Sequence, residues 1–166
     1  DDRQAEAAVL DFVKKGRPCA FDYETNCLKP QASKARIVCC SVSDGRRSVA
    51  FFWRDRAMAA MKKFLASGVP KVAANAKFED HWSTIAAGVP PNNWFWDTMV
   101  QGHTIDNRRG ITGLKFQAFT LLGQEDYDGH LKGFLETEKG AESINRIHEV
   151  EPNQLLRYCA LDALLE

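Results

Sequence analysis

Two acidic residues follow a short apolar stretch near the start of the chain and limit how it can fold. Residues 18–21 (PCAF) are typical of a buried β-strand, and Asp22 and Glu24 come directly after them. Side chains two positions apart on a strand point to the same face, so these carboxylates would repel each other and lose hydration. A divalent cation such as Mg²⁺ or Mn²⁺ would relieve both costs, because hard cations prefer carboxylate oxygens. The alternative is a strand that ends in a polar turn, with both acids in water.

Composition indicates one globular domain. The 166 residues are 45% hydrophobic and 27% charged, which is enough apolar material for a real core. No apolar run approaches the ~20 residues that span a bilayer, and no signal-peptide pattern opens the chain. We therefore expect a cytoplasmic monomer that does not contact membranes. The sequence starts without Met and ends inside a predicted helix, so we expect an excised domain or an incomplete terminus.

The cysteines, the histidines and the net charge argue against several kinds of binding site. The five Cys are odd in number and form no C-x-x-C pair, so neither a zinc site nor a disulfide framework is indicated. The four His show no metal-ligand spacing. The net charge of zero argues against a strongly basic coat that binds nucleic acid non-specifically. It still allows local basic residues to balance an acidic metal site.

The periodicity of the sequence predicts an α/β domain. Residues 36–43 are rich in Val, Ile and Cys, and residues 48–53 follow them across Asp44-Gly45, a strong hairpin signal. With the first strand they would form an antiparallel meander. Strands then alternate with helices, which predicts parallel additions to the sheet. The expected helices cover residues 2–15, 55–67, 76–87, 97–105, 114–122 and 152 onward, with strands at 71–74 and 94–96 and with short helices and mobile loops over 124–149.

This layout is a mixed five-stranded sheet with helices on both faces, and it places an acidic motif at a strand–helix junction. Asn75 can cap the helix that begins there, and Glu79 and Asp80 lie in its first turn, where the helix dipole favours acids. That local role is one explanation for both acids. The other is that one of them faces the acidic strand and helps to hold a second metal ion.

The last helix carries a tyrosine and an acid on one face. Tyr158 and Asp162 are four residues apart beside several leucines, which predicts a position at the edge of the core or in a cleft. The alternative is a Tyr packed in the core and an Asp in solvent. Asp97 precedes another helix, and a capping role explains it better than a catalytic one.

Taken in order, these motifs resemble those of the 3′–5′ exonucleases of the DEDD (DnaQ-like) superfamily, in the subgroup whose third motif carries Tyr. The proofreading domains of bacterial and phage family A DNA polymerases are the most similar. Their motifs F-D-x-E-T, N-x-K-[FY]-D, D-T-M and Y-x-x-x-D correspond to residues 21–25, 75–79, 97–99 and 158–162. The resemblance covers nearly the whole chain.

The resemblance implies a ribonuclease-H-like fold and a single 3′–5′ exonuclease domain over residues 1–166. It also implies that two divalent ions, Mg²⁺ or Mn²⁺, act on the attacking and leaving oxygens of a phosphodiester. Asp22, Glu24 and Asp162 would hold the first ion, and Asp22 would bridge to the second. Tyr158 would orient the attacking water rather than take its proton, because an ordinary phenol is a poor base near neutral pH.

One position departs from the family pattern. The Asp of the second motif falls on Glu79 here, which keeps the carboxylate and the spacing from Asn75. Asp80 would point about 100° further round the helix. We therefore assign Glu79 to the second metal ion.

The implied substrate is the 3′ end of single-stranded DNA, which would lose nucleoside 5′-monophosphates with weak sequence preference. Thr25 would lie near the terminal sugar, and Asn75 and Phe78 match substrate-contact positions. Leu28 matches a position that wedges against the terminal base, although an apolar residue in a polar loop can also be a loop anchor. Four basic residues could meet phosphates or form a solvated face: Arg108, Arg109, Lys115 and Lys132.

Other functions share these motifs. An RNA 3′-exonuclease of the ribonuclease D type is one alternative, and a catalytically inactive nucleic-acid-binding domain is another. All four carboxylate positions are filled here, which argues against the inactive domain. A polymerase module could follow Asp162, in which case the domain would proofread in a bacterial or phage system.

Overall fold

The computed structural model describes residues 1–137 and 142–166 and contains a five-stranded sheet in the order β3-β2-β1-β4-β5. β1 pairs antiparallel with β2 and β2 with β3, whereas β4 and β5 add in parallel on the other side of β1. The strands are β1 (Cys19–Thr25), β2 (Ile37–Ser43), β3 (Ser48–Phe52), β4 (Lys71–Ala73) and β5 (Trp94–Asp97). The helices are α1 (Asp2–Lys15), α2 (Asp55–Ala66), α3 (Ala76–Trp82), η1 (Ser83–Ala87), α4 (Thr98–Ile105), α5 (Leu114–Leu122), α6 (Lys132–Leu135), η2 (Ile147–Glu149) and α7 (Pro152–Leu165).

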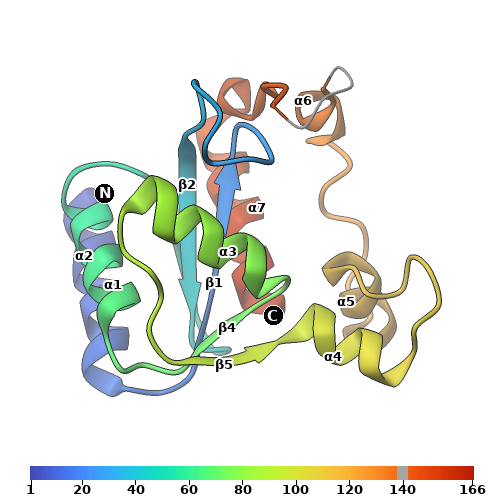
Figure 1. Ribbon diagram of the computed structural model, residues 1–166, viewed down its shortest axis with the longest axis horizontal. Coiled ribbons are helices and arrows are strands. Elements are labelled where there is room, and N and C mark those ends of the chain that lie inside the picture. Colours follow the sequence, from blue (N-terminus) through green and yellow to red (C-terminus); the bar gives the residue numbers. More distant parts are fainter. Residues whose placement is uncertain (138–141) are drawn as a thin grey trace.

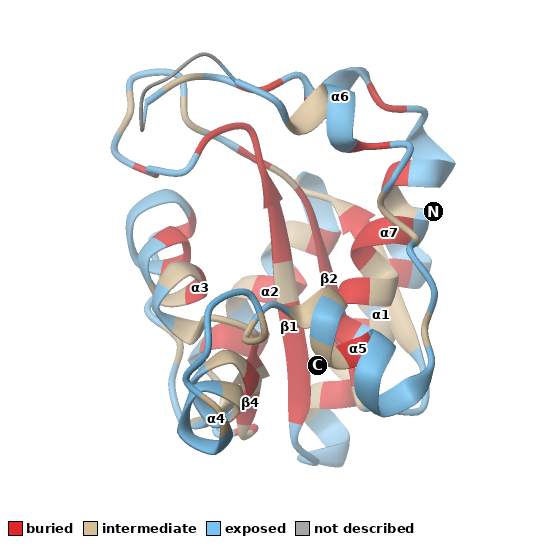
Figure 2. Ribbon diagram, turned by 90° about the vertical axis from the view of Figure 1, so that its right-hand side faces the viewer, coloured by how far each residue is buried: buried red, intermediate tan, exposed pale blue. Residues whose placement is uncertain are grey.

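The helices cover both faces of the sheet, as predicted (Figure 1). α1 and α2 pack together on one face, over an apolar core that includes Phe12, Phe21 and Phe64. α7 lies on the other face against β1, β2 and β3, over a second core that includes Ile147 and Leu155. Figure 2 shows that β1 and β2 carry many of the buried residues between these layers. β1 therefore has a hydrophobic core on each side.

Most predicted elements lie where they were expected, with a few differences. β1 runs to Thr25, so both acids lie on the strand as predicted, and the alternative of a strand that ends in a polar turn before them is wrong. The expected helix over 76–87 is the α-helix α3 followed by the wider π-helix η1. The stretch 124–149 contains the short helices α6 and η2, and its residues 138–141 lie outside the described residues. Within the described chain, no helix combines the length and the apolar character that a membrane crossing requires.

Asp97 caps two helices at the ends of the parallel strands. Its carboxylate accepts hydrogen bonds from the backbone N–H groups of Met99 and Val100 at the start of α4. It also accepts from the N–H groups of Asn75 at 3.2 Å and Ala76 at 2.8 Å, at the start of α3. Asn75 occupies the predicted N-cap position of α3, but its side chain does not cap the helix. Asn75 has a φ of 76° and its side chain makes no capping bond, because Asp97 supplies the acceptor. The structural role expected of Asp97 is confirmed.

Candidate active site

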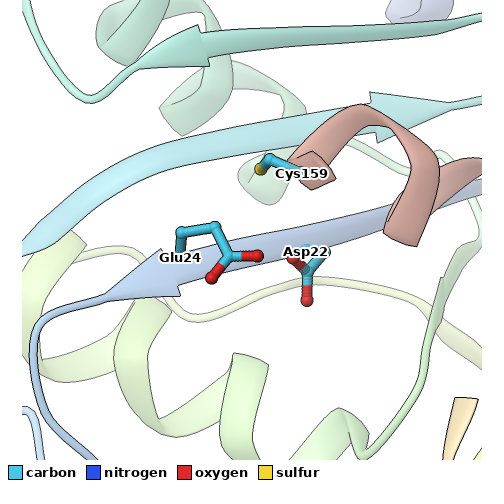
Figure 3. Close-up of side chains that lie close together, drawn as sticks. All are labelled: Asp22, Glu24 and Cys159. Carbon is cyan, nitrogen blue, oxygen red and sulfur yellow. The ribbon is translucent and has the colours of Figure 1, made fainter. Parts of the chain in front are cut away.

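The alternation of β1 divides its side chains between the two cores. Phe21 and Tyr23 belong to the core under α1 and α2, so Asp22 and Glu24 point to the opposite face, toward α7. Figure 3 shows both carboxylates along β1, with Cys159 reaching in from α7. One oxygen from each acid and the Cys159 sulfur lie within 4.8 Å of one another. Glu24 is only 7% exposed, so the alternative of both acids in water is wrong.

α7 brings Tyr158 and Asp162 to the same region. Both residues are buried, and Asp162 is 4% exposed, so the alternative of an Asp in solvent is wrong. The hydroxyl of Ser41 on β2 donates to the carbonyl of Cys159 at 2.6 Å. This bond ties α7 to the sheet next to the acidic strand. Cys159, rather than Asp162, completes the tight group with the two acids of β1.

Asp162 has two close neighbours from the chain between α4 and α7. The Lys115 ammonium, on α5, donates to both Asp162 oxygens at 2.6 Å and to the Tyr158 hydroxyl at 3.0 Å. The Tyr127 hydroxyl donates to Oδ1 of Asp162. The sequence suggested that Lys115 contacts phosphates or belongs to a solvated face, and it suggested no role for Tyr127. Tyr127 follows α5 in a stretch without periodicity, so no local signal could have identified it.

The structure separates the two acids of α3. Glu79 is 2% exposed, and its Oε2 is buried without a hydrogen-bond partner among the described residues. Asp80 instead accepts a hydrogen bond from the Trp94 indole at 2.9 Å. A helix-dipole role alone does not explain why Glu79 is buried, because first-turn acids can stay in solvent. The structure thus directs Glu79 inward and Asp80 toward β5.

Burial raises the pKa of the carboxyl groups in this region. The pKa of Asp22 rises to about 7 through burial and then through the charge of Asp162. The pKa values of Glu24 and Glu79 lie well above the usual range, through burial first and the charge of Asp22 second. The same two causes raise the pKa of Glu166, at the end of the chain beyond α7. These acids are costly to ionise together, and a nearby cation would lower that cost.

The donor atoms fit a hard divalent cation. Oδ2 of Asp22 is buried and, like Oε2 of Glu79, has no hydrogen-bond partner in the described chain. Mg²⁺ and Mn²⁺ prefer such carboxylate oxygens. Burial raises the pKa of the Cys159 thiol, so the sulfur stays protonated and is a poor ligand. Burial also raises the pKa of Tyr158, whose hydroxyl keeps its proton and can donate a hydrogen bond.

A pocket of about 270 Å³ opens beside Glu24. Thr25, Leu28 and Phe78, three of the four residues expected to contact substrate, line it, whereas Asn75 does not. Leu28 is 70% exposed, so it does not anchor its loop in the core. Three residues that line this pocket were therefore among the substrate contacts expected from the sequence.

Asn145 lines the same pocket and was not anticipated. Its amide donates to the carbonyl of Thr25 at 3.0 Å, and its backbone N–H donates to the carbonyl of Asn26 at 2.8 Å. These bonds hold the segment before η2 against the end of β1. Because the contact joins residues 120 positions apart, no local pattern in the sequence could indicate it.

Three of the four basic residues have separate acidic partners. Lys115 contacts Asp162, as described above. Arg108 pairs with Asp106 at 2.6 Å, and Lys132 pairs with Asp126 at 3.1 Å. Both of these pairs are largely exposed, which fits a solvated face.

The sequence matches the profile of a protein family over residues 1–165, and the description of that family is 3′–5′ exonuclease. No curated protein sequence matches the chain. The match to the family thus covers the acidic residues of β1 and α3 and all of α7.

Solved structures share the fold at low sequence identity. Brucella melitensis NrnC with bound Mg²⁺ has a TM-score of 0.61 and 19% identity, over 89% of this chain and 66% of that one. Trypanosoma brucei RNase D has a TM-score of 0.70 and 17% identity, over 99% and 59%. The POL domain of Pol1 from M. smegmatis has a TM-score of 0.60 and 15% identity, over 97% and 25%. The chain thus spans two thirds or less of these three chains. The matches confirm the predicted ribonuclease-H-like fold.

Proposed function

The chain belongs to the 3′–5′ exonuclease family, and we propose on this basis that it removes nucleotides from the 3′ end of single-stranded DNA with the help of two divalent metal ions. The products would be nucleoside 5′-monophosphates. The observation that carries the proposal is the set of buried carboxylates on β1, α3 and α7, with a tyrosine beside them. The proposal treats residues 1–166 as a single exonuclease domain that acts in the cytoplasm as a monomer.

Each residue of this set has a proposed role. Asp22, Glu24 and Asp162 would hold one ion, and Asp22 and Glu79 would hold the other. The buried, unpartnered Oδ2 of Asp22 and Oε2 of Glu79 support this assignment. Bound ions would supply an activated water and neutralise the charge of the scissile phosphate. The Tyr158 hydroxyl, which keeps its proton because burial raises its pKa, would orient the water rather than act as the base.

The pocket beside Glu24 is the proposed site of the 3′-terminal nucleoside. Its position next to the carboxylates would bring the last phosphodiester to them. Leu28 and Phe78 would contact the base, and Thr25 would lie by the sugar. The exposed Leu28 offers an apolar surface of the kind on which an unpaired base can rest. Asn75, outside the pocket, would contact the strand from the start of α3.

RNA is the second candidate substrate. Two of the solved structures that share the fold are RNase D and NrnC. The pocket also contains polar side chains, Thr137, Ser143 and Asn145, which could bond a ribose 2′-hydroxyl. The catalytic residues would be the same for either substrate.

Degradation of labelled strands tests the proposal. DNA and RNA of one sequence, each carrying a 5′ label, are incubated with the protein and Mn²⁺. We expect a ladder that shortens from the 3′ end, faster with DNA, and no ladder with Asp22→Asn. A ladder with RNA alone would favour the second candidate. Binding without cleavage of either strand would exclude both and favour an inactive nucleic-acid-binding domain.

We also propose a proofreading role alongside a polymerase module. Proofreading requires a mismatched 3′ end to be removed faster than a paired one, because only an unpaired terminus can enter the pocket. Duplexes that differ only in the last base pair test this role. Equal rates on both duplexes would exclude it without affecting the exonuclease assignment.

A further inference from the structure

Lys115 contacts two of the proposed catalytic residues at once. Its ammonium lies 2.6 Å from both oxygens of Asp162 and 3.0 Å from the Tyr158 hydroxyl. The same nitrogen lies 5.1 Å and 4.6 Å from the ring centroids of Tyr127 and Tyr158. In the described part of the chain, no other Lys, Arg or His forms an ion pair with Asp162. Lys115 is therefore a cation built into the acidic region.

A divalent ion bound to Asp162 would lie next to the Lys115 ammonium. Lys115 bonds both carboxylate oxygens, and the Tyr127 hydroxyl bonds one of them as well. A metal ion binds a carboxylate oxygen at about 2.1 Å. An ion on Asp162 would therefore lie close to the ammonium, and the two positive charges would repel each other beside this buried carboxylate. The Lys115 contact and metal coordination by Asp162 oppose each other.

We propose that Lys115 is a tethered competitor for the metal site, which neutralises Asp162 and holds Tyr158 until a divalent ion displaces it. This inference rests on the proposed function, because it requires Asp162 to be a metal ligand. The displaced ammonium would remain on α5, at the edge of the site. Lys115 is thus a positioning residue that weakens metal binding, whereas a ligand strengthens it.

The packing of α5 permits this displacement. Ala118 is its one buried residue, and Phe119, Leu121 and Leu122 are each more than 60% exposed. The Lys115 side chain is itself 34% exposed. The ammonium can therefore leave Asp162 without unpacking a hydrophobic core.

Direct measurement of Mn²⁺ binding by calorimetry tests the proposal without an activity assay. We expect Lys115→Met to bind Mn²⁺ roughly tenfold more tightly than the wild type, which corresponds to a binding free energy more favourable by about 1.4 kcal/mol. The matched control is Lys15→Met, which removes a lysine that pairs with Asp11 at 2.8 Å on α1, and it should bind Mn²⁺ like the wild type. An unchanged or weaker affinity in Lys115→Met would overturn the proposal.

Thermal unfolding gives a second readout. In chelator, Lys115→Met should unfold at a lower temperature than the wild type, because Asp162 loses its cationic partner and keeps the hydrogen bond from Tyr127. Mn²⁺ should then raise its melting temperature more than it raises that of the wild type. Equal Mn²⁺-induced increases in the two proteins would contradict the competition.

Two further outcomes separate this inference from the proposed function. If the wild type neither binds Mn²⁺ nor cleaves a strand, both fail. If it does both and Lys115→Met binds Mn²⁺ like the wild type, only the inference fails. Should Lys115→Met not fold, a crystal structure of the wild type with Mn²⁺ decides. Lys115 displaced from Asp162 would support the proposal, and Lys115 still bonded to Asp162 beside the ion would overturn it.

Discussion

The two faces of β1 bury different chemistry. On one face, Phe21 packs against Phe64 with the ring centroids 5.9 Å apart, and Tyr23 packs edge-on against Phe21. Burial there removes apolar surface from water and stabilises the fold. On the other face, Asp22 and Glu24 lose hydration, which costs free energy when they are charged. One strand therefore stabilises the domain through its aromatic face and carries, on its other face, two acids whose charged forms destabilise it.

The polar side chains of β1 also differ between its two faces. The Tyr23 hydroxyl lies 3.0 Å from the Ser83 hydroxyl, so this polar group of β1 is satisfied within the protein, although the indole nitrogen of Trp82 in the same core has no partner among the described residues. On the face of β1 toward α7, Oδ2 of Asp22 has no such partner among the described residues, and neither does Oε2 of Glu79 on α3. A buried polar atom without a partner costs stability. The difference indicates that the acidic face is built to bind something the protein does not itself supply.

The largest expected effect is on catalysis, from Asp22→Ala. Because Asp22 is proposed to contact both ions, its loss should lower the cleavage rate by ~10⁴-fold. The melting temperature in chelator should stay the same or rise, because a buried charge is removed. Rates with Mn²⁺ and melting curves of the same preparation check both expectations. Activity within tenfold of the wild type would contradict the metal assignment.

Substitution of the neighbouring residue, Phe21, should lower the stability of the domain and leave its cleavage rate nearly unchanged. Phe21→Ala leaves a cavity in the core under α1 and α2 and should lower the free energy of unfolding by about 3–5 kcal/mol. The rate per folded molecule should stay within a few-fold, because Phe21 does not face the acids. Urea unfolding and cleavage rates at low temperature measure the two quantities. A large loss of rate in the folded variant would show that the two faces are not independent.

The stability of the domain should also depend on pH through the acidic face of β1, where Asp22 titrates, and not through its aromatic face. The pKa of Asp22 is about 7 in the folded protein and near 3.8 when unperturbed, so the folded state binds this proton more tightly. The stabilisation is complete below about pH 4 and is lost as the pH rises through 7, by up to about 4 kcal/mol. In chelator, the wild type should lose more stability between pH 5 and pH 8 than Asp22→Asn does. Parallel pH profiles of the two proteins, measured by urea unfolding, would contradict the assignment.

Features set by neighbouring residues could be predicted from the sequence, whereas contacts between distant residues could not. The five strands, the Asp44-Gly45 turn and the shared face of Asp22 and Glu24 follow from local periodicity and turn chemistry, and the structure confirms them. The parallel addition of the last two strands followed from the alternation of strands with helices. Local patterns were sufficient for the framework because each strand carries its own alternation.

The contacts that could not be predicted join distant parts of the chain. Lys115 and Tyr127 reach Asp162 from a stretch whose path over the sheet has no signature in the sequence. The capping bond expected from the Asn75 side chain is supplied by Asp97, 22 positions away. Such contacts depend on how elements are placed in space, and residue spacing does not encode that placement.

The smallest expected effect distinguishes the two acids of α3 with variants of equal size. Glu79→Gln removes a proposed ligand charge of the second ion and should lower the cleavage rate by roughly 10–100-fold. Asp80→Asn should keep the rate within twofold, because Asn can still accept the hydrogen bond from Trp94. Steady-state rates at saturating Mn²⁺ check both. If Asp80→Asn lost more activity than Glu79→Gln, the inward direction of Glu79 would have no catalytic meaning. The second ion would then be held from the β5 side of α3, and the acidic face of β1 would supply ligands to the first ion alone.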